Sequence, residues 1–199
     1  MEEIKKEKQP YYIFMNIGGT LWDIEHIENV HGPFVNGIDR HILKPASVEA
    51  MNLLIDSLEE QFDTKLVITS SDRKDFAECV RHLKYNGLKY DKPIFRTAVS
   101  GLSRGYAIVD YLSTNKEAPL TYPKLKTIFG RIIYNNNESP NDFKNYVVLE
   151  SIEKRISKEI PKSRRIITNM HKALTDEQVI DFLTKNNIPF KQEKQNQPQ

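Results

Sequence analysis

Three polar residues, Asn16, Ser70 and Glu150, each directly follow a mostly apolar run of the sequence. Runs of this kind are typical of strands that are buried on both faces of a parallel sheet. Ligands of such sheets bind at the carboxyl ends of the strands, where amide, hydroxyl and carboxylate groups can hold phosphate or a metal ion. We therefore expect Asn16, Ser70 and Glu150 to lie in one shared crevice.

The residues around Asn16 form a motif in which two acidic positions are replaced. Residues 16–23 read Asn-Ile-Gly-Gly-Thr-Leu-Trp-Asp. They resemble the first motif of the haloacid dehalogenase (HAD-like) superfamily, which is a strand followed by Asp-x-Asp-Gly-Thr-Leu-x-Asp. Gly19, Thr20, Leu21 and Asp23 match this motif. Asn16 stands at the position of the family's nucleophilic Asp, and Gly18 stands at that of its general acid.

These two replacements remove the chemistry that the family uses. A carboxylate can attack phosphorus and form an aspartyl-phosphate, whereas the neutral amide of Asn16 is a weak nucleophile. Gly18 has no side chain that could exchange a proton with the leaving group or with water. Both carboxylates also normally help to neutralise Mg²⁺, which prefers anionic oxygen ligands. The resemblance therefore implies the scaffold of a phosphohydrolase without its catalytic groups.

The remaining motifs of the superfamily have counterparts in the same order along the chain. The resemblance implies that Ser70, with Thr69 as the close alternative, hydrogen-bonds phosphate and that Arg104 stabilises the phosphoryl group. Glu150 and Ser151 stand where two Asp residues usually hold Mg²⁺, so a further acidic position is lost. The implied ligand site consists of Asn16, Gly18, Gly19, Thr20, Ser70 and Arg104, with Glu150 as the metal ligand.

The order and spacing of these motifs are most similar to the HAD domain of Swiss Army Knife RNA repair proteins. The matching segments are Ser70-Ser71-Asp72-Arg73, the stretch from Arg104 through Ile108 to Tyr111-Leu112, Leu149-Glu150-Ser151 and Ala173-Leu174-Thr175. The resemblance spans about residues 11–186. It implies an α/β fold with three layers, Rossmann-like (HAD-like), in which helices cover both faces of a mostly parallel sheet and no large cap domain is present.

Apolar periodicity predicts the elements of a single α/β domain over residues 10–190. Strands are expected near 11–16, 65–69, 146–149 and 165–168, and helices near 46–62, 73–86 and 104–113 and from Thr175 onward. Residues 70–72 are expected to cap the second helix, which should stop at Asn86-Gly87. Residues 24–44 are predicted to form a loop, and residues 116–144 an insertion or irregular connection with one short helix or strand pair. Residues 1–9 and 191–199 are predicted to be flexible.

Composition restricts the class of protein. The 199 residues suffice for one domain with a core, and the net charge of +2 is too balanced to indicate a nucleic-acid or membrane partner by itself. Cys79 is the only cysteine, so neither an intramolecular disulfide nor a cysteine zinc site can form. The five histidines lack the spacing of metal ligands. The N-terminus has no signal-peptide pattern and no apolar stretch could span a bilayer, so we expect a cytoplasmic protein.

Each candidate residue also has a purely structural interpretation. The glycines after Asn16 could serve only a strand-to-turn connection, and Ser70 could serve only as a helix cap. Arg104 could be a solvated helix residue, and Glu150 could be an exposed acid of a loop. Trp22 is expected to pack under the motif loop rather than to stack on a ligand.

Three functions fit these observations. The first is a pseudo-phosphatase that needs no cofactor and acts as a binding or regulatory module for a phosphate- or nucleotide-type ligand. The second is a Mg²⁺-dependent phosphohydrolase for nucleotide or RNA-end phosphates that uses Glu150 and Asp23, in which Asp72 or an activated water would replace the nucleophile. The third is a protein-interaction domain whose partner binds the 116–144 insertion. We favour the first, because two carboxylates are missing from one loop.

Overall fold

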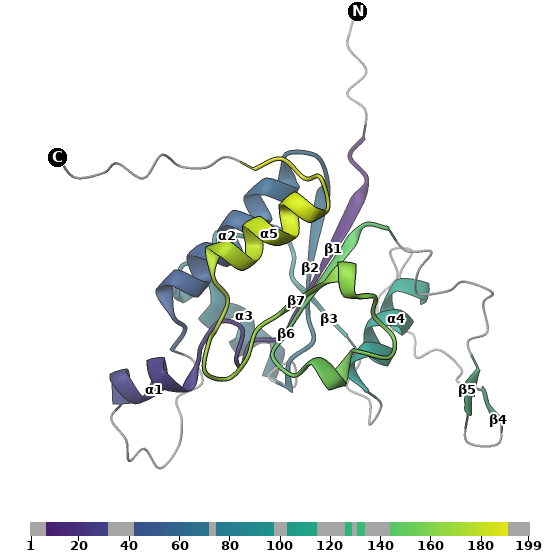
Figure 1. Ribbon diagram of the computed structural model, residues 1–199, viewed down its shortest axis with the longest axis horizontal. Helices are drawn as coiled ribbons and strands as arrows, with labels where there is room; N and C mark the ends of the chain where they lie inside the picture. Colours follow the sequence, from purple (N-terminus) through teal and green to yellow (C-terminus); the bar gives the residue numbers. More distant parts are fainter. Residues whose placement is uncertain are drawn as a thin grey trace, which may run out of the picture.

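Five strands form one parallel sheet in the order β3-β2-β1-β6-β7 (Figure 1). The computed structural model describes residues 7–31, 42–71, 75–97, 103–114, 126–128, 131–133 and 144–190. The strands of the sheet are β1 (Pro10–Met15), β2 (Asp63–Ile68), β3 (Phe95–Arg96), β6 (Tyr146–Glu150) and β7 (Arg165–Ile167). The fold is therefore α/β with an all-parallel, Rossmann-like sheet, as the alternation of strand and helix patterns predicts.

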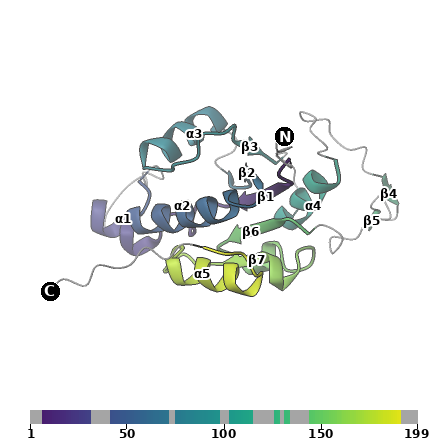
Figure 2. The same ribbon diagram turned by 90° about the horizontal axis from the view of Figure 1, so that it is seen from above.

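Helices cover both faces of this sheet, and Figure 2 shows α4 on the opposite side from α2 and α5. The helices are α1 (Ile24–His31), α2 (Pro45–Glu59), α3 (Phe76–Tyr85), α4 (Arg104–Thr114) and α5 (Asp176–Lys185). Successive side chains of a strand point to opposite faces. Ile13 and Met15 of β1 accordingly lie in the larger hydrophobic cluster with α2, α3 and α5, whereas Phe14 lies in the smaller cluster with α4. Among the described residues, no helix is both long and apolar enough to cross a membrane.

The predicted helix signals at the ends of α3 and α5 are confirmed. Gly87 follows α3 with a φ of +93°, and the Leu88 N–H donates to the Leu83 carbonyl at 3.1 Å. This is the left-handed ending that glycine favours, because it has no Cβ to clash. At the start of α5, Thr175 and Gln178 form a capping box in which each side chain accepts from the other's backbone N–H.

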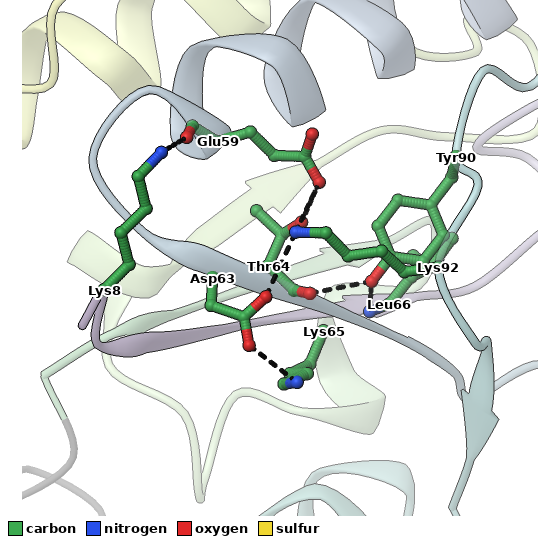
Figure 3. A network of polar contacts seen from close by, with 8 residues as sticks. All are labelled: Lys8, Glu59, Asp63, Thr64, Lys65, Leu66, Tyr90 and Lys92. Atoms are coloured by element: carbon green, nitrogen blue, oxygen red, sulfur yellow. Dashed lines mark hydrogen bonds and ion pairs between the residues drawn. The ribbon is translucent and has the colours of Figure 1, made fainter. Parts of the chain in front are cut away.

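A polar network lies at the amino end of β2, on the edge of the sheet opposite to the candidate site (Figure 3). Asp63 pairs with Lys65 at 2.7 Å and with Lys92 at 3.1 Å, and Glu59 pairs with Lys92 at 2.9 Å. The hydrogen bond from Lys65 is the main reason that the pKa of Asp63 lies below its usual value. The hydroxyl of Tyr90 joins the same region, because it donates to the Thr64 carbonyl at 2.7 Å. These contacts fix the end of α2 and the chain after α3 to the start of β2.

Two sequence predictions about loops and caps are wrong. Residues 24–31 form α1 rather than a loop, because Asp23 accepts a hydrogen bond from the His26 N–H at 2.9 Å and so caps a new helix. Residues 32–41 lie outside the described residues. Helix α3 begins at Phe76, and Asp75 stands at its N-cap position, three residues later than predicted; Asp72 lies outside the described residues.

The sequence predicts one short helix or one strand pair within residues 116–144, and the structure has the strand pair. Strands β4 (Lys126–Ile128) and β5 (Arg131–Ile133) pair in antiparallel register and form a second, two-stranded sheet. Apart from these strands and Lys144, the connection lies outside the described residues, as do residues 1–6 and 191–199.

Candidate functional site at the carboxyl ends of the strands

The strand order places three of the predicted site residues at neighbouring strand ends. Asn16 follows β1, and its backbone N–H donates to the Leu149 carbonyl of β6 at 3.0 Å, next to Glu150. On the other side of β1, the Thr69 N–H donates to the Met15 carbonyl at 2.9 Å, and Ser70 follows directly. Asn16, Ser70 and Glu150 therefore lie along one edge of the sheet, and all three are buried.

The side chain of Asn16 is held as a hydrogen-bond donor. Its Nδ2 donates to the Gly18 carbonyl at 2.5 Å and to Ser151 Oγ at 3.0 Å. The Ser151 hydroxyl in turn donates to the same Gly18 carbonyl at 2.8 Å. Asn16 is only 4% exposed, so Nδ2 makes these hydrogen bonds inside the protein. A carboxylate at this position could not donate these hydrogen bonds.

Close packing requires glycine at position 19 and leaves little room for a side chain at position 18. Gly19 has a φ of +74°, and a Cβ at this residue would lie 2.5 Å from the Cβ of Ser151 and 2.8 Å from Sδ of Met170. A Cβ at Gly18 would lie 3.1 Å from the ring of Trp22. Trp22 is 7% exposed and packs against the motif turn, as predicted. The turn therefore packs closely against Trp22 on one side and against Ser151, which follows β6, on the other.

Thr20 and Asp23, which match the motif, hold the loop in place. The hydroxyls of Thr20 and Thr168 share a hydrogen bond of 3.4 Å. The fully buried carboxylate of Asp23 pairs with Lys44 at 2.7 Å and accepts from the Ala173 N–H at 3.1 Å. Burial raises the pKa of Asp23, but the hydrogen bonds from Lys44, His26 and Ala173 outweigh burial and bring the pKa below its usual value.

Arg104 and Glu150 form a direct ion pair. The guanidinium of Arg104 donates to Oε2 of Glu150, while Oε1 accepts from the backbone N–H groups of Ser151 at 2.9 Å and Ile152 at 3.1 Å. The Glu150 side chain is fully buried and that of Arg104 is only 11% exposed. The solvated interpretations of both residues are therefore wrong, because each neutralises the other inside the protein.

The described contacts join the site residues in two groups. Asn16 contacts Gly18 and Ser151, whereas Arg104 contacts Glu150. The peptide bond between Glu150 and Ser151 connects the groups, so Arg104 and Asn16 are linked through β6 rather than directly. Ser70 is placed beside them by the pairing of β2 with β1.

Several residues that complete the site were not identified as candidates. Lys44, Thr168, Met170 and Ala173 contact the motif loop, although each is far from it in sequence. No local pattern marks Lys44, Thr168 or Met170, whereas Ala173 lies in the Ala173-Leu174-Thr175 segment that resembles a family motif but is not among the predicted site residues. Ser151 could be recognised as a site residue from its motif position. Its role as a hydrogen-bond partner of Asn16 depends on the strand order.

The residues of this edge do not fit a Mg²⁺ site. Magnesium ions prefer several free anionic oxygens. Here Asn16 presents an N–H donor, Gly18 has no side chain, and Glu150 is already neutralised by Arg104. In the part of the chain that the structure describes, no group of three or more His, Cys, Asp or Glu side chains could hold a metal ion.

The chain matches no protein-family model, no curated protein and no solved structure. The comparisons therefore assign it to no family. Any functional conclusion has to come from the arrangement of its own residues.

Proposed function

We propose that this chain is a catalytically degenerate HAD-like domain, a pseudo-phosphatase, that acts as a binding or regulatory module. The observation that carries the proposal is the orientation of the Asn16 amide, whose Nδ2 is committed to the Gly18 carbonyl and to Ser151. In the family that the motif resembles, the same position presents a nucleophilic carboxylate.

The surroundings of Asn16 support the same conclusion. Attack on phosphorus requires a nucleophile, and proton transfer requires an ionisable group within hydrogen-bond reach of the reacting atoms. The position of the general acid is occupied by Gly18, whose carbonyl accepts two hydrogen bonds from its neighbours. The two acids that remain are both paired, Glu150 with Arg104 and Asp23 with Lys44. The polar groups of this loop therefore stabilise the fold, and none of them is placed to attack phosphorus or to transfer a proton.

The ligand that we propose for this module is a phosphorylated small molecule or a nucleic-acid end. The hydroxyl of Ser70 and the backbone of the Gly18-Gly19 turn lie along the edge where parallel sheets bind ligands. Replacement of acidic side chains by neutral ones also reduces the repulsion of an anion.

Two other functions have less support. A Mg²⁺-dependent phosphohydrolase would need free carboxylates, and the acids of this edge are paired with Arg104 or Lys44. A protein partner on the 116–144 connection stays a prediction, because most of that connection lies outside the described residues.

Phosphate release tests the proposed function. Wild-type protein and the double variant Asn16→Asp/Gly18→Asp are incubated with Mg²⁺ and either a generic aryl phosphate or 5′- and 3′-phosphorylated RNA. We expect no turnover from wild type and a gain of turnover in the double variant, because both missing carboxylates are restored. Asn52→Asp, which adds a carboxylate away from the site, is the matched control and should stay inactive.

Turnover by the wild-type protein that Glu150→Ala abolishes would overturn the proposal. The Asp at position 18 requires the Trp22 ring to shift by a few tenths of an ångström, since an added Cβ would lie 3.1 Å from it. Circular dichroism and thermal unfolding of the double variant therefore accompany the assay, so that a folding defect is recognised.

A further inference from the structure

Three donors converge on the carboxylate of Glu150. The guanidinium of Arg104 binds one oxygen, and the consecutive backbone N–H groups of Ser151 and Ile152 bind the other at 2.9 and 3.1 Å. The carboxylate has no exposed surface. An ionised carboxylate is stable in such a place only because these donors replace its water shell.

This arrangement is the one by which proteins bind oxyanions of other molecules. A guanidinium fits carboxylate and phosphate groups equally well, and successive backbone N–H groups form an anion-binding concavity. The donors come from the start of α4 and from the two residues that follow β6, and Ser151 also contacts the Gly18-Gly19 turn. Here the bound oxyanion belongs to the chain itself.

The contact with Glu150 restricts what Arg104 can bind. Its guanidinium is committed to Glu150, and the side chain is 11% exposed, so it is not open to a phosphate group from solution. An external oxyanion would have to displace the Glu150 carboxylate, which is tethered to the site and therefore competes at a high effective concentration.

We propose that Glu150 is an internal oxyanion ligand that keeps Arg104 and the Ser151 and Ile152 amides from binding a carboxylate or phosphate group of another molecule. The inference rests on the proposed function, in which this edge of the sheet binds ligands without turnover. It adds that binding through Arg104 is autoinhibited and depends on displacement of Glu150.

Glu150→Gln tests this inference directly. The amide oxygen can still accept from the two backbone N–H groups, but the NH₂ group no longer binds the guanidinium, so Arg104 is released. Inorganic phosphate and acetate are titrated separately by calorimetry into wild type and the variant. We expect one or both to bind the variant at least about tenfold more tightly than wild type, and the two probes distinguish phosphate from carboxylate as the preferred group.

Glu153→Gln is the matched control. Glu153 lies three residues later, is 53% exposed and pairs with Arg165 at 3.0 Å, so its replacement changes the net charge equally without touching Arg104. This control should bind both probes as weakly as wild type. The double variant Arg104→Gln/Glu150→Gln should lose the gained binding, because the guanidinium supplies it.

A second measurement keeps the inference testable if Glu150→Gln folds poorly. Glu150→Ala removes a group nearly identical to acetate, so its thermal midpoint should rise with increasing sodium acetate and should not rise with equal sodium chloride. Equal effects of the two salts would overturn the inference, as would equal affinities of Glu150→Gln and Glu153→Gln for both probes.

The phosphate-release assay separates this inference from the proposed function. Turnover by wild type contradicts the pseudo-phosphatase proposal whatever the binding data show. Absence of turnover together with unchanged oxyanion binding in Glu150→Gln contradicts only the role of Glu150 as an internal ligand.

Discussion

At the scale of single residues, the difference between an amide and a carboxylate decides what the motif loop can do. Asn16 donates one hydrogen bond to the Gly18 carbonyl and one to Ser151 Oγ, and the Ser151 hydroxyl donates to the same carbonyl. An aspartate in the same place would bring a negative charge against a carbonyl oxygen in a buried environment. The loop is therefore chemically adapted to asparagine, even though its backbone pattern resembles one that carries aspartate.

We predict that Asn16→Asp lowers the free energy of unfolding by about 1–3 kcal/mol near neutral pH, because a buried donor is replaced by an acceptor. Urea denaturation in the presence and absence of Mg²⁺ checks this expectation. Because Asn16→Asp restores only one of the two missing carboxylates, Mg²⁺ should not restore the lost stability.

Asn52→Asp is the control for this prediction. Its amide likewise donates to a glycine carbonyl, that of Gly87 at 3.0 Å, and its side-chain oxygen accepts from the Lys89 N–H at 2.9 Å. A recovery of stability by Mg²⁺ in Asn16→Asp but not in Asn52→Asp would reveal a metal site and contradict our interpretation.

At the scale of elements, the motif loop is held by the segment that follows β7. The Leu174 N–H donates to the Thr20 carbonyl at 2.8 Å, and the Met170 carbonyl accepts from the Ile24 N–H at 2.7 Å. Asp23 adds the link to Ala173 and, through Lys44, to the start of α2. One buried carboxylate thus connects the loop after β1, the start of α2 and the segment before α5.

We predict that Asp23→Asn lowers the free energy of unfolding at neutral pH by about 1–3 kcal/mol, because the amide cannot accept all three of the hydrogen bonds that the carboxylate accepts. Asp181→Asn is the matched control. Asp181 pairs with Lys185 at the same 2.7 Å, but its side chain is 59% exposed. Its replacement should cost less than about 1 kcal/mol in urea denaturation. If Asp23→Asn and Asp181→Asn lose the same free energy of unfolding, the burial of Asp23 does not strengthen its contribution to stability.

The contribution of Asp23 to the free energy of unfolding should also depend on pH. Its pKa in the folded protein lies below the unfolded value of about 3.9. The stability that it contributes is therefore present above that unfolded value and is lost as the pH falls through the folded value. The difference between wild type and Asp23→Asn should shrink on acidification, and a difference that grows in acid would contradict the assigned sign.

At the scale of the whole molecule, β1 lies at the centre of the structure. It is hydrogen-bonded to β2 on one side and to β6 on the other, and its last three residues are fully buried. Strand β7, in contrast, is three residues long and pairs only with β6 within the described residues. The motif loop thus begins at the central strand of the sheet, which is buried and paired on both sides.

We predict that amide hydrogens of residues 12–15 exchange most slowly and that those of residues 165–167 exchange faster. Opening of a central strand requires loss of pairing on both sides, so its exchange should approach the global unfolding limit, whereas an edge strand can open locally. Hydrogen–deuterium exchange with mass spectrometry checks this order, with a fully denatured sample as the reference. Slower exchange in β7 than in β1 would contradict the described strand order.

Local patterns predict much of this fold. The apolar runs locate β1, β2 and β6, helical spacing locates α2, and the capping box marks the start of α5. The sequence predicts a loop in place of helix α1, because Asp23 matches a motif and its second role as the helix cap has no separate signal. The start of α3 was misplaced because Ser and Asp residues favour caps wherever they occur.

The sequence by itself determined that the motif loop lacks two carboxylates and that Asn16, Ser70 and Glu150 follow buried strands, because both follow from residue type and local periodicity. Only the tertiary structure decided the partners of these residues. Asn16 meets Ser151 across 135 positions, Arg104 meets Glu150 across 46, and Asp23 meets Ala173 across 150. The physical reason is that these contacts depend on the strand order, which places β6 beside β1 and which no local pattern encodes.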